Sequence, residues 1–518
     1  MLQQYSKYAK LKTQTASTIT VPAPIGGWNA RDSLGAMDIQ DAVTLQNWWP
    51  GTNSVVLRYG YSKYATGMTG QVETVMTYAS GSQDKLFACV GTKVYNATAG
   101  GAVGSADLTG LTNARWQYVN FTNTGGSYLM MVNGADKLRI YDGSAWHKDG
   151  DGAGYDISGV DTAQCSNINL FKNRIWLIQD QTLKAWYLPI NAIAGAATVL
   201  DMSSLVQMGG YLVAGMTWTL DAGYGMDDYL AFITSRGEVL VWRLTDPTTP
   251  SGISLIGVYT VGTPIGSRCW VKFGGDLLII TQDGVVPMSG SLQSSRLDPR
   301  VSITNKIQYA MSTAISNYSA NFGWCLLYFP KENQLIMNVP VQENANQQQY
   351  VMNNITKSWC NFTGWNANCW TLYKDNPYFG GDGYVGQAWN TNADDGNDIN
   401  SFGLQSFQTY GRANQKQCEM IRYHLFTNGT PQIYGNVNVD YNIIDQSVSL
   451  DFSVETYATW GTSLWDAGIW GDTLVPNSQW QGVTQIGYSF APLIKSASQG
   501  IQLQWVASDL VFSGGGTL

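Results

Sequence analysis

The chain has few charged residues, almost no histidine and no long apolar run. Only 13% of its 518 residues are charged, against roughly 25% in an average globular protein. No apolar run reaches the roughly 18 residues that a membrane-spanning helix needs, and the N-terminus lacks the apolar centre of a secretory signal. We therefore expect a soluble, unprocessed chain that is made in the cytoplasm and has no membrane span.

The scarcity of histidines, cysteine pairs and known catalytic motifs argues against several kinds of active and metal site. His147 and His424 are the two histidines, and neither has a second histidine or cysteine at ligand spacing, which disfavours a zinc site and a histidine-dependent triad. Seven cysteines without a CxxC pair argue against a disulfide framework. No phosphate-binding GxxxxGK[ST] loop and no GxSxG motif occurs. The sequence predicts no catalytic residue, no metal, no cofactor and no enzyme activity.

Several acidic clusters are weak candidates for chemistry. The pairs Asp227/Asp228 and Asp394/Asp395 are expected to be turn neighbours, which are more often solvated than catalytic. Asp394, Asp395 and Asp398 do not have the alternating spacing of a calcium loop, and DGDGAGYD (149–156) resembles a calcium repeat only loosely. We expect solvated turns at both places.

The charge balance also argues against nucleic-acid binding. The formal net charge is −8, so no basic face for gripping phosphates is indicated. Lys7, Lys10 and Lys12 form a small cluster near the start, which a solvated arm explains at least as well.

Glycine and aromatic residues are abundant. The chain has 56 Gly, 29 Tyr and 20 Trp, and it is rich in Asn, Gln, Ser and Thr. This composition favours short strands and polar turns over helices. The sequence therefore predicts an all-β fold.

One strand–turn–strand unit recurs along the chain. GGDLLIITQDGVVPMSG (274–290) has two apolar runs around Asp283 and Gly284, which predicts a hairpin with a two-residue turn. Similar units recur at intervals of 43 to 57 residues, about the length of one four-stranded propeller blade. Their turns centre near Gly91, Gly134, Asp180, Gly237, Gly284, Glu332 and Gly383.

A further apolar strand precedes the hairpins. It contains Met76, Val119, Cys165, Cys269 or Cys369, about fifteen residues before the turn. The cysteines in this slot are expected to be small buried hydrophobic residues that pack one blade on the next. Such small sheets bury both faces only by stacking, and closing the ring protects their edges. We predict a β-propeller of six to eight blades over residues 71–398.

The flanks, 1–70 and 399–518, lie outside the repeat. The polar segment 390–403 predicts a domain boundary, and alternating segments beyond 400 predict a β-sandwich or extended sheet. Trp460, Trp465 and Trp470 are spaced by five residues, which fits neither one helical face nor one strand face. A protein interface, a core beneath loops and a sugar-stacking surface all stay open for them.

The segment PIGGWNARDSLGAMDIQDAVTLQNWWPGTNSVVLRYGY (24–61) resembles the opening of tail nozzle proteins of short-tailed bacteriophages, also called tail tubular or packaged-DNA stabilisation proteins. GGDLLIITQDGVVPMS also resembles their central part. The specific match covers about a tenth of the chain. The matching residues are Gly26, Gly27, Trp28, Asn29, Asp41, Ala42, Asn47, Trp48, Pro50, Arg58, Gly60 and Tyr61.

The resemblance implies a structural virion protein of the phage tail. It would form a homohexamer below the portal and its adaptor ring, as the distal part of a tube that retains packaged double-stranded DNA and lets it pass at ejection without specific binding. The flanks would build a docking platform and tip, with tail fibres or spikes at the junction with the adaptor. Candidate assembly residues are Trp28, Asn47, Trp48, Pro50, Arg58, Trp460, Trp465 and Trp470.

Two rival functions remain open at this point. A tail-borne module could bind host-surface glycans through the tryptophan-rich segment. A propeller glycan hydrolase could use two carboxylates that meet across the central channel.

Overall fold

The computed structural model describes residues 16–81, 83–152, 154–221, 226–291, 301–411, 413–445, 448–450 and 474–514. These residues are mostly β-strand with few helices, which confirms the predicted all-β class. The chain divides into two compact units. One unit is Arg58–Ile399, and the other combines Met1–Leu57 with Asn400–Leu518.

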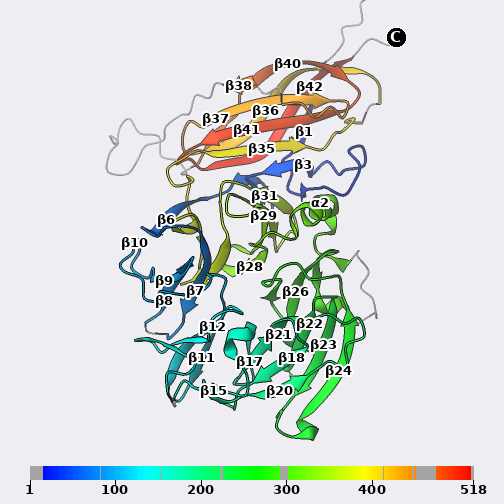
Figure 1. The fold of residues 1–518 in the computed structure, drawn as a ribbon. Coiled ribbons are helices and arrows are strands. Elements are labelled where there is room, and N and C mark those ends of the chain that lie inside the picture. The colour runs from blue at the N-terminus through cyan, green and yellow to red at the C-terminus, as the bar shows by residue number, and fades with distance from the viewer. Residues whose placement is uncertain are drawn as a thin grey trace, which may run out of the picture. The chain divides into compact units, whose positions relative to one another are not determined.

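Six small antiparallel sheets of the first unit are the blades of a β-propeller (Figure 1). The strands are β7–β9 (Val72–Tyr78, Lys85–Val90, Lys93–Asn96); β11–β14 (Gln117–Asn123, Gly126–Val132, Arg139–Tyr141, Trp146–Lys148); β16, β17, β18 and β20 (Cys165–Phe171, Arg174–Gln179, Lys184–Tyr187, Thr198–Asp201); β21–β24 (Leu212–Asp221, Met226–Thr234, Glu238–Leu244, Ile253–Thr260); β25–β27 (Trp270–Phe273, Asp276–Thr281, Gly284–Pro287); and β32–β34 with β6 (Cys369–Tyr373, Asn376–Gly380, Val385–Thr391, Gly60–Thr66). First strands of neighbouring sheets contact one another, β7 with β11, β11 with β16, β16 with β21 and β32 with β7, and β21 contacts β26 of the following sheet.

A further four-stranded meander completes the ring between β25–β27 and β32–β34. Its strands are β28–β31 (Cys325–Phe329, Gln334–Gln342, Asn346–Asn353, Trp359–Phe362). Strand β28 contacts β25 on one side and β32 on the other. The short helix α1 (Met288–Ser291) and the longer α2 (Gln308–Tyr318) lie between β27 and β28 in the chain, and α2 contacts β29. Minor pairings involve β10 (Gly101–Ala102), β15 (Ile157–Ser158) and β19 (Gly195–Ala196).

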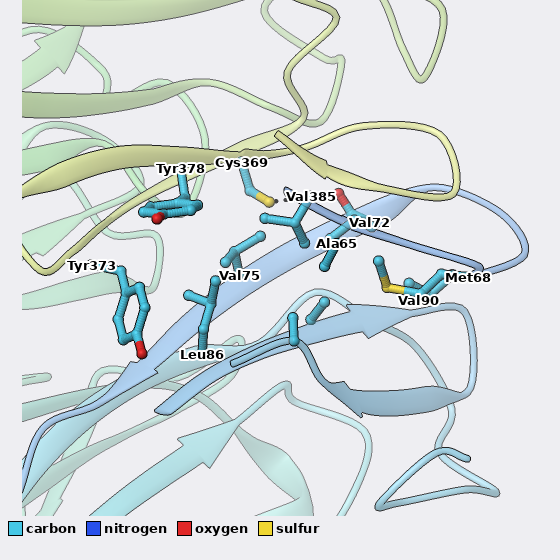
Figure 2. Packing of buried hydrophobic residues seen from close by; sticks show 12 residues of the cluster. Ala65, Met68, Val72, Val75, Leu86, Val90, Cys369, Tyr373, Tyr378 and Val385 are labelled. Carbon is cyan, nitrogen blue, oxygen red and sulfur yellow. Dashed lines mark hydrogen bonds between the residues drawn. The ribbon is translucent and has the colours of Figure 1, made fainter. Parts of the chain in front are cut away.

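An early strand closes the ring. Strand β6 pairs antiparallel with β34, so that the outer strand of the last sheet comes from the beginning of this unit. The sheet it completes packs against β7–β9 through a core that Figure 2 shows, in which Val72, Val75 and Leu86 face Cys369 and Val385. All five side chains are at most 1% exposed. Burying one such aliphatic side chain stabilises a fold by roughly 1.5–3 kcal/mol. This core, which we call the closing seam, therefore stabilises the closed ring.

The positions of the hairpins follow the sequence pattern. Six of the seven expected hairpins join the second and third strands of the six small sheets, whereas the one near Glu332 joins β28 to β29. As expected, the apolar strand that precedes a hairpin is the first strand of its sheet. Met76, Val119 and Cys165 lie in the first strands β7, β11 and β16.

Two local expectations were wrong. In β26–β27, Thr281 pairs with Gly284, so the two turn residues are Gln282 and Asp283 rather than Asp283 and Gly284. Gly284 instead begins β27 with φ +105°, a backbone angle that a Cβ atom disfavours. Asp227 and Asp228 are not turn residues; they pair with Leu220 and Thr219 inside the long hairpin β21–β22.

The second unit is built from both flanks of the chain. Two sheets contain all its strands in the described residues. The first has β1 (Ser17–Pro22), β4 (Trp48–Pro50), β5 (Val55–Leu57), β36 (Lys416–Thr427), β39 (Val475–Asn477), β40 (Trp480–Gly487) and β42 (Leu503–Gly514); the second has β2 (Gly27–Trp28), β3 (Asp41–Gln46), β35 (Ile399–Gln405), β37 (Gln432–Val439), β38 (Val448–Leu450) and β41 (Phe490–Ser498).

The two sheets of this unit pack face to face as a sandwich. The buried Tyr423 of β36 places its hydroxyl 2.5 Å from the carbonyl oxygen of Leu493 and 3.1 Å from that of Asn436, both in the other sheet. Trp48 and Trp505, each fully buried, lie beside it with ring centroids 5.9 Å apart. Residues from the two ends of the chain therefore share one core.

The observed units begin and end at different residues from the expected domains. The propeller unit starts at Arg58 rather than at 71, because β6 belongs to its last sheet. It ends at Ile399, within the polar segment that predicts a boundary. The N-terminal lysines and the tryptophans Trp460, Trp465 and Trp470 lie outside the described residues.

Candidate functional site

One arginine spans the axis of the propeller. Arg268 lies two residues before β25, and its guanidinium donates to three acceptors on the other side of the ring. Nη1 lies 3.0 Å from the carbonyl oxygen of Glu73, and Nη2 lies 2.6 Å from Oγ1 of Thr74 and 3.0 Å from the carbonyl oxygen of Trp116. Because these acceptors belong to β7 and to the residue before β11, Arg268 ties three sheets together.

A second arginine completes this axial cluster. Arg115 lies two residues before β11 and pairs with Glu73 at 3.0 Å and Glu343 at 2.6 Å. The ring of Phe322 lies near both guanidinium groups, with its centroid 4.2 Å from Cζ of Arg115 and 5.2 Å from Cζ of Arg268. Burial opposes the charge of Arg115, but the two glutamates outweigh it and raise its pKa above the ordinary value.

Shorter polar contacts extend the cluster around the axis. Nδ2 of Asn368 donates to Oε1 of Gln71 at 2.6 Å, and Nε2 of Gln71 donates to the carbonyl oxygen of Asn344 at 2.9 Å. The hydroxyls of Tyr118 in β11 and Thr371 in β32 lie 2.9 Å apart. These contacts link first strands around the ring. We call the central group the axial cluster; it consists of Arg115, Arg268, Glu73, Glu343 and Phe322.

Sequence reasoning missed the axial cluster, although a signal for it exists. Arg115 and Arg268 occupy the same position in their blades, two residues before the first strand. An arginine repeated at one position of a propeller unit indicates a role at the axis. The partners of that arginine cannot be read from the sequence, because Glu73 and Glu343 come from other sheets.

A cavity of about 400 Å³ lies beside the axial cluster, at the same end of the first strands. Its walls come from three consecutive blades: the start of β16, the β17–β18 turn, the start of β21, the β22–β23 turn and the segment before β25. Ser267, one of its lining residues, immediately precedes Arg268. Its lining is rich in hydroxyl groups, including those of Ser166, Tyr211 and Thr263.

Arg58, one of the candidate assembly residues, is buried inside the propeller unit, where its guanidinium binds a carboxylate. Its side chain is 0% exposed, and Nη1 and Nη2 donate to the two carboxylate oxygens of Asp394 at 2.9 and 2.6 Å. Nη2 also donates to the carbonyl oxygen of Thr363 at 2.5 Å, and Cζ lies 4.8 Å from the ring centroid of Trp365. The expectation that Asp394 is a solvated turn residue was therefore wrong.

The remaining residues of the early motif are also mainly internal. Asn47 is buried, adopts φ +58° and donates from Nδ2 to the carbonyl oxygen of Asn400 at 2.7 Å. Trp48 and Pro50 are buried in β4, and Trp28 is half-buried in β2. A Cβ atom at Gly60 would lie 1.9 Å from the carbonyl oxygen of Ala393. Asn47, Trp48 and Arg58 therefore present no surface to a partner subunit, which corrects their assignment as interface candidates.

The acidic candidates are separated by the fold. Asp395 pairs with Lys63 at 2.8 Å and Asp398 is exposed. Asp149 of the glycine-rich segment is buried and accepts hydrogen bonds from Thr162 Oγ1 at 2.6 Å and from the backbone N–H of Ile157 at 2.9 Å. No group of three or more His, Cys, Asp or Glu side chains that could hold a metal ion occurs in the described part of the chain.

The two histidines lie in different units beside different carboxylates. Nε2 of His147 lies 3.1 Å from Oδ2 of Asp142, and its ring stacks on Tyr155 with centroids 3.9 Å apart. Burial opposes ionisation of Asp142, but hydrogen bonds from the backbone of Ala145 and Ser144 hold its pKa well below the ordinary value. Each histidine is thus bound to a structural carboxylate.

All seven cysteines are buried and unpaired. Cys165, Cys269 and Cys369 lie at or next to the start of a first strand, which confirms the buried packing role expected for them. Burial raises the pKa of Cys369 to about 11 and that of Cys165 and Cys269 to about 12. These thiols stay protonated near neutral pH, so they are poor nucleophiles.

Comparison with known proteins yields fold likenesses alone. No family model and no curated protein matches the chain. The β-propeller domain of Myceliophteria thermophila Cps50 (Swd1) is 14% identical with a TM-score of 0.37, covering 64% of this chain and 100% of that one. YCF48 bound to a D1 peptide is 11% identical with a TM-score of 0.37, covering 64% and 95%.

BBS1N in complex with ARL6DN gives a weaker match. It is 13% identical with a TM-score of 0.29, covering 42% of this chain and 64% of that chain, so this chain spans less than two thirds of its length. Separately, no described helix is long and apolar enough to cross a membrane.

Proposed function

We propose that this protein is a structural component of a bacteriophage tail: a homohexameric nozzle that docks below the portal-adaptor ring, retains the packaged genome and lets it pass at ejection. The observation that carries the proposal is the shared sandwich of the two flanks. The resemblance at residues 24–61 implies a platform built by the flanks with the propeller placed outside it. A unit that combines Met1–Leu57 with Asn400–Leu518, separate from the propeller unit, has the division of the chain that such a platform requires.

The internal role of the matched residues supports the same proposal. Trp48 lies in the sandwich core, and Arg58 locks the first residue of the propeller unit to Asp394. Trp48 thus stabilises the sandwich unit, and Arg58 binds the first residue of the propeller unit to a residue near its end. A motif that fixes architecture in this way suits a structural protein.

The pairing of cations supports a tube that does not hold DNA. Each phosphate neutralised by a lysine or arginine strengthens DNA binding. In this chain of net charge −8, cations of both units are paired with carboxylates: Arg115 with Glu73, Arg174 with Asp246, Arg422 with Asp509 and Lys495 with Asp445. Such pairing leaves less positive charge for contact with passing DNA.

Exposed apolar side chains on the sandwich support self-assembly. Trp480 and Ile486 of β40 are 39% and 56% exposed, and Met420 of the paired strand β36 is 37% exposed. Arg422 covers one face of Trp480, with Cζ 4.5 Å from the ring centroid. Large exposed apolar groups of this kind typically mark protein interfaces.

The test is the rotational symmetry of the purified full-length protein, alone and mixed with the portal-adaptor protein of the same phage, in electron micrographs. We expect sixfold rings. A Trp480→Glu/Ile486→Glu double variant should fail to form them, whereas Ile190→Glu, a change at an equally exposed apolar residue of the propeller, should leave the rings intact. A protein that stays monomeric both alone and with the adaptor would contradict the proposal.

A second test addresses the role in the particle. Disrupting the gene should give capsids that package DNA and then lose it, measured as DNA protected from nuclease. Capsids that retain their DNA at the normal level would rule out a role in genome retention.

A further inference from the structure

The cavity beside the axial cluster has the size of a small-molecule site. Its volume of about 400 Å³ falls within the roughly 300–1,000 Å³ typical of ligand pockets. Three consecutive blades contribute to it, so its walls are held by the first strands β16 and β21 and by the segment that leads into β25. The lining therefore comes from strand starts, turns and one connecting segment of three blades.

The polar groups in this cavity have unused hydrogen-bonding capacity. Ser166, Asp180, Gln181, Tyr211 and Thr263 are among its lining residues, and within the described residues their side chains form no hydrogen bond. A ligand could therefore bind a carboxylate, an amide and three hydroxyl groups without breaking any contact inside the protein.

Two further hydroxyls are oriented by the fold. Oγ of Ser235 accepts from the backbone N–H of Tyr211 at 3.2 Å, and Oγ of Ser267 accepts from Nε2 of Gln117 at 3.3 Å. Each hydroxyl keeps its own proton for donation, because it acts as the acceptor in these contacts. The lining thus offers both donors and acceptors from several directions.

The charge of the lining limits the class of ligand. Among the described residues that line the cavity, Asp180 is the one charged residue, and none is a lysine or arginine. A phosphate or carboxylate ligand would meet this negative charge without a compensating cation. A neutral ligand with several hydroxyl groups fits better, because hydrogen bonds from hydroxyls to a carboxylate are charge-assisted and strong.

The cavity also has an apolar side. Leu212, Val213 and Pro264 line it together with the half-buried Tyr211, whose ring offers an apolar face next to its hydroxyl. A sugar ring combines an edge of hydroxyl groups with an apolar face of C–H groups. The lining of this cavity combines the two matching surfaces.

We propose that this cavity binds a neutral saccharide unit, with Asp180 and Gln181 contacting adjacent sugar hydroxyls and Tyr211 or Pro264 contacting its apolar face. The proposal involves no bond cleavage. It also does not depend on the hexameric nozzle, since the cavity lies within one propeller, and it does not involve the tryptophan-rich segment.

The test is a binding titration of the full-length chain with three neutral probes, the methyl glycosides of glucose, galactose and N-acetylglucosamine, followed by saturation-transfer NMR. Asp180→Ala removes the carboxylate, and Ser267→Trp places a large ring at the cavity. Asp156→Ala is the matched control, because Asp156 is an exposed carboxylate of the same unit outside the lining. Nα-acetyl-lysine methylamide serves as a cationic probe. Melting temperatures of all variants identify any change that merely unfolds the protein.

We expect at least one neutral glycoside to bind saturably. Asp180→Ala should weaken it by about tenfold or more, as for the loss of a hydrogen bond to a charged group, Ser267→Trp should abolish it, and Asp156→Ala should leave it unchanged. The proposal is overturned if no glycoside binds at about 10 mM, ten times the dissociation constant of a millimolar site. It is also overturned if folded Ser267→Trp still binds, or if the cationic probe alone binds.

Discussion

Arg58 and Asp394 are 336 positions apart in the chain and form a two-pronged ion pair in the interior of the propeller unit, with N–O distances of 2.9 and 2.6 Å. The guanidinium also donates a hydrogen bond to the carbonyl oxygen of Thr363 and lies over the ring of Trp365. Because Arg58 is the first residue of the unit and Asp394 lies near its end, this pair fastens the two ends of the propeller to each other.

The first prediction concerns this pair. Asp394→Asn should lower the free energy of unfolding by about 3–5 kcal/mol, because it leaves the charge of Arg58 buried without a counter-ion. The adjacent change Asp395→Asn is the matched control: its partner Lys63 is 42% exposed, and exposed pairs contribute only about 0–1 kcal/mol. Denaturant unfolding of both variants measures the difference, and equal midpoints would show that the buried pair does not stabilise the ring.

The second prediction concerns the axial cluster. Arg268→Ala should lower the free energy of unfolding by about 1.5–3 kcal/mol, the range for a hydrogen bond to a charged group, since it removes the donor to Glu73, Thr74 and Trp116. Arg236→Ala is the control at an exposed arginine of the same unit. Hydrogen exchange of β7 and β25 gives a local measure, and these strands should exchange faster in Arg268→Ala alone.

The third prediction concerns the closing seam in Figure 2. Leu86→Ala should destabilise the protein by about 2–5 kcal/mol, because the seam cannot fully collapse into the space that the side chain leaves. Val199→Ala in β20, where the side chain is 42% exposed, should change stability by at most about 0.5 kcal/mol. Thermal and denaturant unfolding compare the two. A small effect at Leu86 would mean that other contacts close the ring.

The fourth prediction concerns thiol reactivity. Burial raises the pKa of Cys369 to about 11 and that of Cys165, Cys269, Cys325 and Cys418 to about 12, and the thiolate is the reactive form. A disulfide exchange reagent should therefore label no cysteine of the native protein at about pH 8 and all seven after unfolding in guanidinium. Rapid labelling of one native thiol would reveal an exposed, reactive site.

The fifth prediction concerns acid stability of the sandwich. Burial of Asp509 opposes its ionisation, but hydrogen bonds from Thr20, Arg422 and His424 outweigh it and lower the pKa of this carboxyl to about 2. A carboxyl whose pKa is depressed in the folded state stabilises the fold above its unfolded pKa of about 3.9, and this contribution is lost as the pH falls through the folded value.

The stability of the wild-type protein should therefore decrease between about pH 4 and pH 2, measured by denaturant midpoints across this range. Asp509→Asn should be less stable at neutral pH and should lose this part of the pH dependence. An Asp509→Asn variant with the same acid profile as the wild type would assign the effect to other carboxyls.

The repeating hairpins were predictable because their causes are local. Alternating apolar residues and turn residues act within about ten positions, and the sequence places β26 and β27 in this way. The exact turn was shifted by one residue to Gln282 and Asp283, since strand pairing with neighbours decides the register.

Local pattern therefore determined that this chain makes many small antiparallel sheets with buried cysteines at the start of their first strands. Tertiary structure alone decided which distant segments meet: β6 with β34, Arg58 with Asp394, Arg268 with Thr74, and the two flanks in one sandwich. The physical reason is that these contacts join residues far apart in the chain, and no short sequence pattern sets the distance between such residues.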